Sequence, residues 1–134
     1  VVMSHVIEHL PKAAIIDTLG LIRTRLLKPG APLLVAVPNA QSNTGCYWAY
    51  EDFTHSTLFT AGSLEYVLKA AGFGSVTFLD PEGLWDTRTA TRWLKKILLR
   101  LYEARVRFWN KVTTSSFHRP SPAIFTYELK AIAK

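Results

Sequence analysis

The chain has 134 residues, enough for one domain at most, and its hydrophobic content of 49% supports a packed core and excludes a disordered chain. No apolar run approaches the roughly 20 residues that span a bilayer, so the sequence predicts no transmembrane helix. The net charge is +6, and the single cysteine, Cys46, has no partner in the chain, so we expect a protein of a reducing compartment, the cytoplasm.

A strand–helix–strand pattern opens the chain. A strand is predicted at 1–4, where the apolar run 1–3 ends in a polar turn, and Pro11 stands where a helix can begin, because the first helical residues have no amide partner. Apolar residues recur at helical spacing until Pro29-Gly30, and the unbroken apolar run at 33–37 is typical of a strand covered on both faces. The pattern predicts a parallel βαβ unit. Such units form ligand crevices at the carboxyl ends of their strands.

Residues 41–59 are rich in polar, glycine and aromatic residues and are predicted to form a long loop with a short helix near 46–50. Loops of this length in compact domains are usually functional. Thr60 is expected to cap the helix that follows, and Gly72 to end it. A further strand is predicted at 75–79, where apolar and polar residues alternate.

The positive charge is concentrated in a helix predicted at about 88–111. This segment holds eight Lys and Arg residues and one Glu, a net +7, which leaves eight bases and nine acids, a net −1, elsewhere. Its apolar residues share one helical face, as in a helix that lies on an anionic membrane surface. The alternatives are an anionic acceptor such as a phosphorylated or lipid-linked glycan, a solvated helix that covers the sheet, and a dimer contact. The segment has no recognised nucleic-acid motif, so nucleic acid is not an expected partner.

The last predicted elements are a linker at 113–122 and a β-prone strand at 123–133. The strands on either side of the basic helix can pair antiparallel. The element order indicates an α/β fold. Because the chain begins with Val1, inside the first predicted strand, we expect it to be the back part of a longer protein.

Three series of residues carry a family resemblance: HVIEHLP from residue 5, LKPGAPLLVAVPNA from residue 27 and DFTHSTLFTAGSLEYVLKAAGF from residue 52. In combination they resemble the second half of a class I S-adenosylmethionine-dependent methyltransferase. They resemble in particular the bacterial small-molecule and glycan-associated enzymes, which are similar to the ubiquinone-pathway O-methyltransferases. The resemblance covers about the first eighty residues well and the last strand loosely.

The resemblance implies a Rossmann-like sheet in the order 3-2-1-4-5-7-6, with strand 7 antiparallel. This chain would hold the half-sheet 4-5-7-6, with 1–80 as a core, 84–116 as a basic amphipathic helical insertion and 117–134 as the final linker and strand. The other half carries the glycine-rich loop that binds S-adenosylmethionine, and these residues contain no such loop. The chain by itself is therefore expected to bind the cofactor poorly and to be inactive, and its first strand to present an unpaired edge.

The resemblance also implies candidate site residues. Ser4, His5 and Val6 follow the first strand, where residues of the family line the methionine end of S-adenosylmethionine; alternatively, His5 only caps the following turn. His55 lies in the loop expected over the carboxyl ends of the strands, and an imidazole with a pKa near ~6.5 is suited to act as a general base. Alternatively, His55 bonds to Glu8 or to backbone and holds the loop.

His5, Glu8 and His9 are spaced i, i+3 and i+4, which places them on one face of a helical turn, where such side chains can ligate a metal. Two related families, the ubiquinone-pathway enzymes and the ribose methyltransferases of small RNAs, have Glu-x-x-Glu-His here and bind a divalent metal. The RNA enzymes add a later histidine where this chain has His55. Because His5 replaces the first Glu, a magnesium site is disfavoured and no metal is assigned. Glu8 and His9 are expected instead to brace the loop that carries His55.

The resemblance thus implies transfer of a methyl group from S-adenosylmethionine to an oxygen of a small molecule, a glycan or a lipid-linked intermediate. Oxygen is favoured because the D/N-P-P-Y signature of amino-group methyltransferases is absent. The expected location is the cytoplasm, at the membrane periphery if the basic helix binds lipid. Two alternatives stay open: a metal-assisted RNA ribose 2′-O-methyltransferase, and a non-catalytic methyltransferase-like domain that binds a membrane or a partner. Tyr47, Trp48, Tyr50 and Phe53 line an acceptor pocket or pack the loop, with packing favoured.

Overall fold

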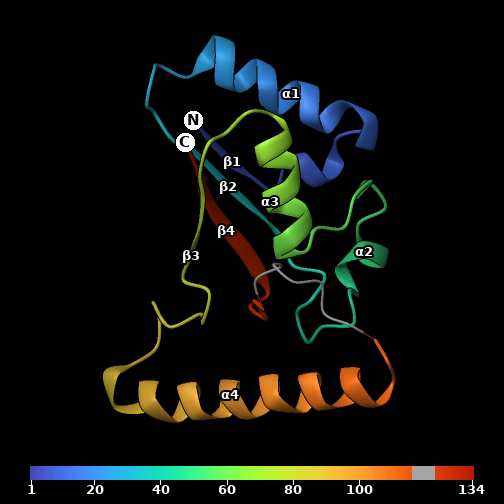
Figure 1. The fold of residues 1–134 in the computed structure, drawn as a ribbon, viewed down its shortest axis with the longest axis vertical. Coiled ribbons are helices and arrows are strands. Elements are labelled where there is room, and N and C mark those ends of the chain that lie inside the picture. Colours follow the sequence, from blue (N-terminus) through green and yellow to red (C-terminus); the bar gives the residue numbers. More distant parts are fainter. Residues whose placement is uncertain (116–122) are drawn as a thin grey trace.

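The protein is described by a computed structural model that covers residues 1–115 and 123–134 (Figure 1). Its centre is a four-stranded sheet in the order β1-β2-β4-β3. The strands are β1 (Val2–Ser4), β2 (Leu33–Pro38), β3 (Val76–Leu79) and β4 (Glu128–Ala133). β1 and β2 are parallel, and β4 runs antiparallel to both of its neighbours, β2 and β3. The mixed α/β class predicted from the sequence is confirmed.

Helices and helical turns lie between the strands in the sequence. Two 3-10 turns (Ile7–His9 and Lys12–Ala14) precede α1 (Ile15–Leu21), which continues as a π-helical turn (Ile22–Leu26); α2 (Trp48–Glu51), α3 (Ala61–Ala70) and α4 (Thr89–Val112) come later. The predicted cap of α3 is confirmed, because Thr60 Oγ1 accepts from the Ser63 amide at 3.2 Å and Ser63 Oγ accepts from the Thr60 amide at 2.9 Å. This reciprocal pair satisfies two helix-end donors.

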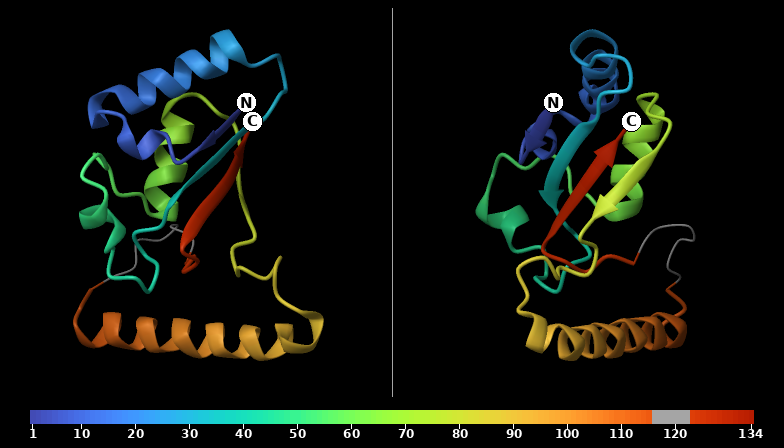
Figure 2. Two further views of the ribbon diagram at one scale, coloured as in Figure 1. Left: turned by 180° about the vertical axis from the view of Figure 1, so that it is seen from behind. Right: turned by 90° about the vertical axis from the view of Figure 1, so that its left-hand side faces the viewer.

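The hydrophobic core lies between the sheet and the helices α1 and α3, which contact each other (Figures 1 and 2). Leu19 of α1, Leu64 of α3 and Leu33 of β2 are each fully buried. Along β2, burial alternates: Leu33, Val35 and Val37 are buried, whereas Leu34 and Ala36 are half-buried. The strand is therefore covered less completely on one face than its unbroken apolar run predicts.

The final strand begins later than predicted, at Glu128 and not at residue 123. The reason is Asn39, whose fully buried side chain donates from Nδ2 to the carbonyls of Ile124 (2.9 Å) and Thr126 (2.8 Å). Residues 124–126 therefore bend around this amide before β4 begins. The backbone amide of Asn39 also donates to the Tyr127 carbonyl, at 2.9 Å. This bond holds the start of β4 beside the end of β2.

Helix α4 crosses the end of the molecule at which β2 ends and β4 begins (Figures 1 and 2). It does not cover a face of the sheet. The alternative that the basic segment is a solvated helix covering the sheet is therefore wrong. None of its 24 described residues is buried. Most of the predicted linker at 113–122 lies outside the described residues. Among the helices that are described, none combines the length and the apolar character needed to cross a bilayer.

Candidate functional site

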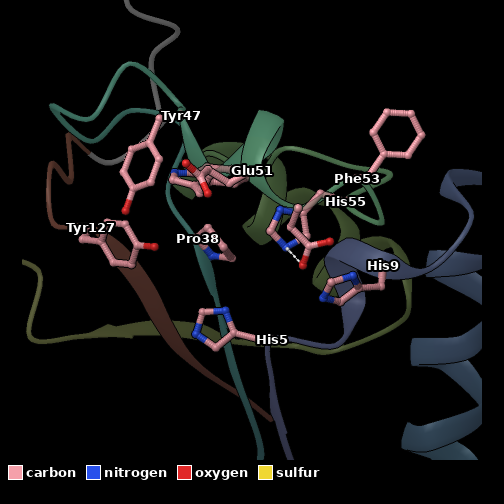
Figure 3. A pocket seen from close by; sticks show the side chains of 10 residues that line it. His5, His9, Pro38, Tyr47, Glu51, Phe53, His55 and Tyr127 are labelled. Carbon is pink, nitrogen blue, oxygen red and sulfur yellow. Dashed lines mark ion pairs between the residues drawn. The ribbon is translucent and has the colours of Figure 1, made fainter.

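An open cleft of about 520 Å³ lies where β1 and β2 end (Figure 3). Its walls come from the turn after β1, the end of β2, the loop around α2 and the start of β4. The lining residues are His5, His9, Pro38, Tyr47, Trp48, Glu51, Asp52, Phe53, His55 and Tyr127. The cleft therefore occupies the carboxyl ends of the two parallel strands, where α/β folds bind ligands.

His5 enters the cleft because the chain turns sharply at this residue. Its φ of 52° is in the left-handed region, which is uncommon for residues other than glycine. Its amide donates to the Ala36 carbonyl at 2.9 Å and so prolongs the pairing of β1 with β2. Ser4 and Val6 are exposed on either side and do not line the cleft, so of the three predicted cofactor residues only His5 does.

The His5 imidazole joins two carboxylates that are far apart in the sequence. Its Nδ1 lies 3.2 Å from Glu8 Oε1, and its Nε2 lies 2.9 Å from Glu128 Oε1. The following 3-10 turn has no side-chain cap, so the alternative that His5 caps it is wrong. Glu128 is placed here by its pairing with Pro38 at the end of β2.

Glu8 is fully buried, and neither of its carboxylate oxygens has a hydrogen-bond partner among the described residues. Its backbone carbonyl accepts from the amides of Ser56 (2.8 Å) and Thr57 (3.1 Å). His9 Nδ1 lies 2.7 Å from Thr54 Oγ1. The two residues thus brace the loop as predicted, but Glu8 does so through its backbone. The ion-pair contact with His5 Nδ1, 3.2 Å from Oε1, is the polar contact that the described side chains give this carboxylate, and a buried carboxylate with so little compensation is costly.

His55 packs against aromatic rings at the inner wall of the cleft. Its side chain is only 8% exposed, and its ring centroid lies 4.7 Å from that of His9 and 5.4 Å from that of Trp48. Its Nε2 lies 3.6 Å from Asp52 Oδ2 (Figure 3), and its buried Nδ1 has no hydrogen-bond partner in the described part of the chain. The alternative in which the His55 side chain bonds to Glu8 finds no such hydrogen bond in the structure.

Asp52 remains ionised beside this imidazole. The Thr54 hydroxyl and the Thr54 amide donate to its carboxylate and hold the Asp52 pKa below its usual range, with a smaller contribution from the nearby histidines. The charged Asp52 carboxylate thus lies 3.6 Å from the His55 imidazole at the wall of the cleft.

The structure brings Glu8, His9 and His55 together, with one ligand atom of each within 4.8 Å of the others. His5, which the sequence spacing also placed beside Glu8 and His9, is not part of this cluster: its Nδ1 contacts Glu8 Oε1 at 3.2 Å, and its Nε2 is engaged with Glu128. Two imidazoles and one carboxylate suit zinc or a similar transition metal better than magnesium, which prefers oxygen ligands. The buried Glu8 carboxylate, whose oxygens accept no hydrogen bond from the described residues and whose ion-pair contact is His5, and the buried His55 Nδ1, which has no hydrogen-bond partner among them, fit such an ion.

Aromatic residues form the outer part of the cleft. Trp48 is buried and packs the loop, as predicted, whereas Tyr50 and Phe53 are exposed. Partial burial and a hydrogen bond with Tyr47 raise the pKa of Tyr127 above its usual range. Sequence reasoning missed Tyr127 and Glu128. The available signal was topological: an antiparallel strand that pairs with β2 must begin where β2 ends.

Comparisons with known proteins agree with this architecture. A family model described as a methyltransferase domain matches residues 1–77. The crystal structure of a SAM-dependent methyltransferase from Archaeoglobus fulgidus is similar to the chain, with a TM-score of 0.61 and 21% sequence identity over 99% of this chain and 57% of that one. The chain thus spans a little over half the length of that protein. None of the curated proteins compared with it is significantly similar.

The family match includes most of the cleft. Residues 1–77 contain β1, β2 and the whole loop from Asn39 to Thr60, and so contribute every lining residue except Tyr127. The match extends over more than half of the chain. The chain belongs to the methyltransferase domain family.

Proposed function

We propose that the cleft is part of the active site of an S-adenosylmethionine-dependent methyltransferase that methylates an oxygen of a small molecule, a glycan or a lipid-linked intermediate. In the order of class I enzymes, β1, β2, β3 and β4 correspond to strands 4, 5, 6 and 7. The observation that carries the proposal is the buried His55, held beside an ionised Asp52 at the carboxyl ends of β1 and β2.

The residues after β1 suit the methionine end of S-adenosylmethionine. Ser4, His5 and Val6 are exposed there, and His5 stands between the carboxylates of Glu8 and Glu128. These carboxylates supply negative charge near a cationic ligand. When bound, the cofactor supplies a methyl group activated by its sulfonium. The rest of its binding site belongs to a half-sheet beyond the edge of β1, and activity is a proposal for the full-length protein.

The task of His55 is to take the proton of the acceptor hydroxyl. Methyl transfer needs little covalent help, so the protein contributes alignment, exclusion of water and proton removal. The imidazole gains a positive charge in this step, and the Asp52 carboxylate, 3.6 Å away, stabilises it. Trp48 and His9 shield the other sides of the ring.

The experiment uses the full-length protein. Titration calorimetry should show binding of S-adenosylmethionine; no binding overturns the proposal. Turnover is measured as release of S-adenosylhomocysteine in the presence of a panel of hydroxylated small molecules and glycans as acceptors. His55→Ala should reduce this release by about 100-fold and leave the affinity for the cofactor unchanged. Tyr50→Ala, on the same loop but outside the cleft lining, is the control and should retain activity. Wild-type turnover in His55→Ala removes His55 from the mechanism.

A second candidate, a metal-assisted methyltransferase, is favoured by the cluster of Glu8, His9 and His55. In this version the three residues hold a transition metal that would orient the acceptor oxygen and acidify its hydroxyl. Titration with Zn²⁺ or Mn²⁺ alone should then show binding that Glu8→Gln removes. Activity that survives exhaustive chelation eliminates this candidate and leaves the general-base version.

A further inference from the structure

The side of α4 that faces the body of the protein is attached mainly by polar groups. Lys95 Nζ donates to the Gly83 carbonyl and lies 3.1 Å from Thr87 Oγ1. Arg92 donates to the Leu84 carbonyl at 3.1 Å. Tyr102 reaches the loop near the cleft, with its hydroxyl 3.4 Å from Asn43 Oδ1. These contacts fix which side of α4 points away from the protein.

The outward side is apolar and exposed. Eight large apolar side chains of α4 have exposed fractions between 44% and 62%: Trp93, Leu94, Ile97, Leu98, Leu101, Phe108, Trp109 and Val112. Residues that face the body, such as Leu99 and Val106, are less exposed. A helix side with this many exposed large apolar side chains is typical of an interaction site, because soluble monomers rarely expose large apolar patches without a function.

A stripe of positive charge runs beside this apolar face. Lys96, Arg100, Arg107 and Lys111 are spaced by about one or two helical turns and so lie along one side of the helix. The side chains of Arg100 and Lys111 make no hydrogen bond or ion pair with any part of the chain that the structure describes. Among the described residues, Lys96 and Arg107 of this stripe pair with carboxylates, those of Glu82 and Glu103.

The charge decides which partner fits. A second copy of this chain would bring a second segment of net charge +7 against the first, and the two would repel. An anionic bilayer satisfies both features at once, because the apolar side chains enter the acyl region while Lys and Arg reach the phosphates. Tryptophan and phenylalanine, both present on the apolar face, suit the interface between the two regions.

We infer that α4 docks the protein on anionic lipid bilayers, parallel to the membrane surface and without crossing it. The lining of the cleft comes from the ends of β1 and β2, and α4 crosses the end of the sheet at which β2 ends (Figure 1), so docking would bring the cleft near the lipid headgroups. This inference does not depend on the proposed methyl transfer.

The test is co-sedimentation of the full-length protein with vesicles of phosphatidylcholine, with and without phosphatidylglycerol. The protein should bind the vesicles that contain phosphatidylglycerol, and binding should weaken as salt is added. Arg100→Gln/Lys111→Gln and Ile97→Gln/Leu101→Gln should each lower the affinity by about tenfold or more. Circular dichroism checks that each variant folds, as expected for exposed positions.

Matched controls lie on the π-helical turn and its flanks, at the end of the molecule opposite α4. Arg25→Gln/Lys28→Gln removes as much positive charge as Arg100→Gln/Lys111→Gln does. Leu21→Gln/Leu26→Gln removes apolar groups that are 60% and 66% exposed. Both should bind like the wild type. Absence of vesicle binding, equal binding without phosphatidylglycerol, or equal loss in the controls overturns the inference. The inference is also overturned if light scattering finds a dimer that Ile97→Gln/Leu101→Gln abolishes and the wild-type protein binds no vesicles.

Discussion

His5 and Glu128 come from the two ends of the chain and meet at the mouth of the cleft, with 2.9 Å between Nε2 and Oε1. The contact exists because β4 pairs with β2 on the side opposite β1, so Glu128 lies beside Pro38 where β2 ends. One side chain thus ties the turn after β1 to the first residue of β4. It also holds a backbone conformation with φ of 52°.

The conformation of His5 predicts an unusual order of stability for two substitutions. His5→Ala removes both carboxylate contacts and keeps a Cβ in the left-handed region, whereas His5→Gly removes the same contacts without that strain. We expect His5→Gly to be more stable than His5→Ala by about 1 kcal/mol in urea unfolding. Equal stability, or a more stable alanine variant, would show that the backbone at residue 5 is not strained.

The capping pair at the start of α3 predicts a coupled loss of stability. Thr60→Ala should destabilise the protein by about 1 kcal/mol, because the amides at the helix start lose an acceptor. Ser63→Ala removes the reciprocal bond. Since the two residues act on each other, the double variant should lose less than the sum of the single losses, as measured by urea unfolding. Strict additivity would contradict a working capping box.

Substitutions of Asn39 are expected to lower stability more than those of His5, Thr60 or Ser63. Asn39→Ala leaves the carbonyls of Ile124 and Thr126 without their donor and should cost about 2 kcal/mol or more. Asn39→Asp should cost at least as much, because a carboxylate then faces two carbonyl oxygens. An aspartate variant as stable as the wild type in urea unfolding would refute the assigned orientation of the Asn39 amide.

The lowered pKa of Asp52 predicts a pH dependence with a definite sign. A carboxyl whose pKa is lower in the folded state stabilises the fold above the unfolded value, near ~3.9, and this contribution is lost as pH falls through the folded value. Thr54→Val should raise the Asp52 pKa toward its ordinary value, because it removes the hydroxyl that contributes most. Thr57→Val, which removes a hydroxyl without contact to Asp52, is the control. The measurement is an NMR titration of the Asp52 carboxyl.

Much of the local structure follows from nearby residues. The apolar run at 33–37 predicts a strand that is found at Leu33–Pro38, and Thr60 predicts the cap of α3 that is present. The long loop, its short helix and the helix of the basic segment were also expected where they occur. These features depend on the spacing of apolar side chains and on caps within a few residues, which the order of residues determines directly.

The site depends on contacts between distant segments. The spacing of His5, Glu8 and His9 predicts one helical face, but in the structure His5 contacts Glu8 and Glu128, and it is His55 that joins Glu8 and His9. Tyr127 and Glu128 reach the cleft only through strand pairing. The direction in which α4 exposes its apolar face depends on its contacts with the body of the protein. The sequence by itself determined the elements and the family resemblance. Tertiary structure decided which side chains meet, because these contacts depend on how distant strands pair and on the backbone angles of the folded chain.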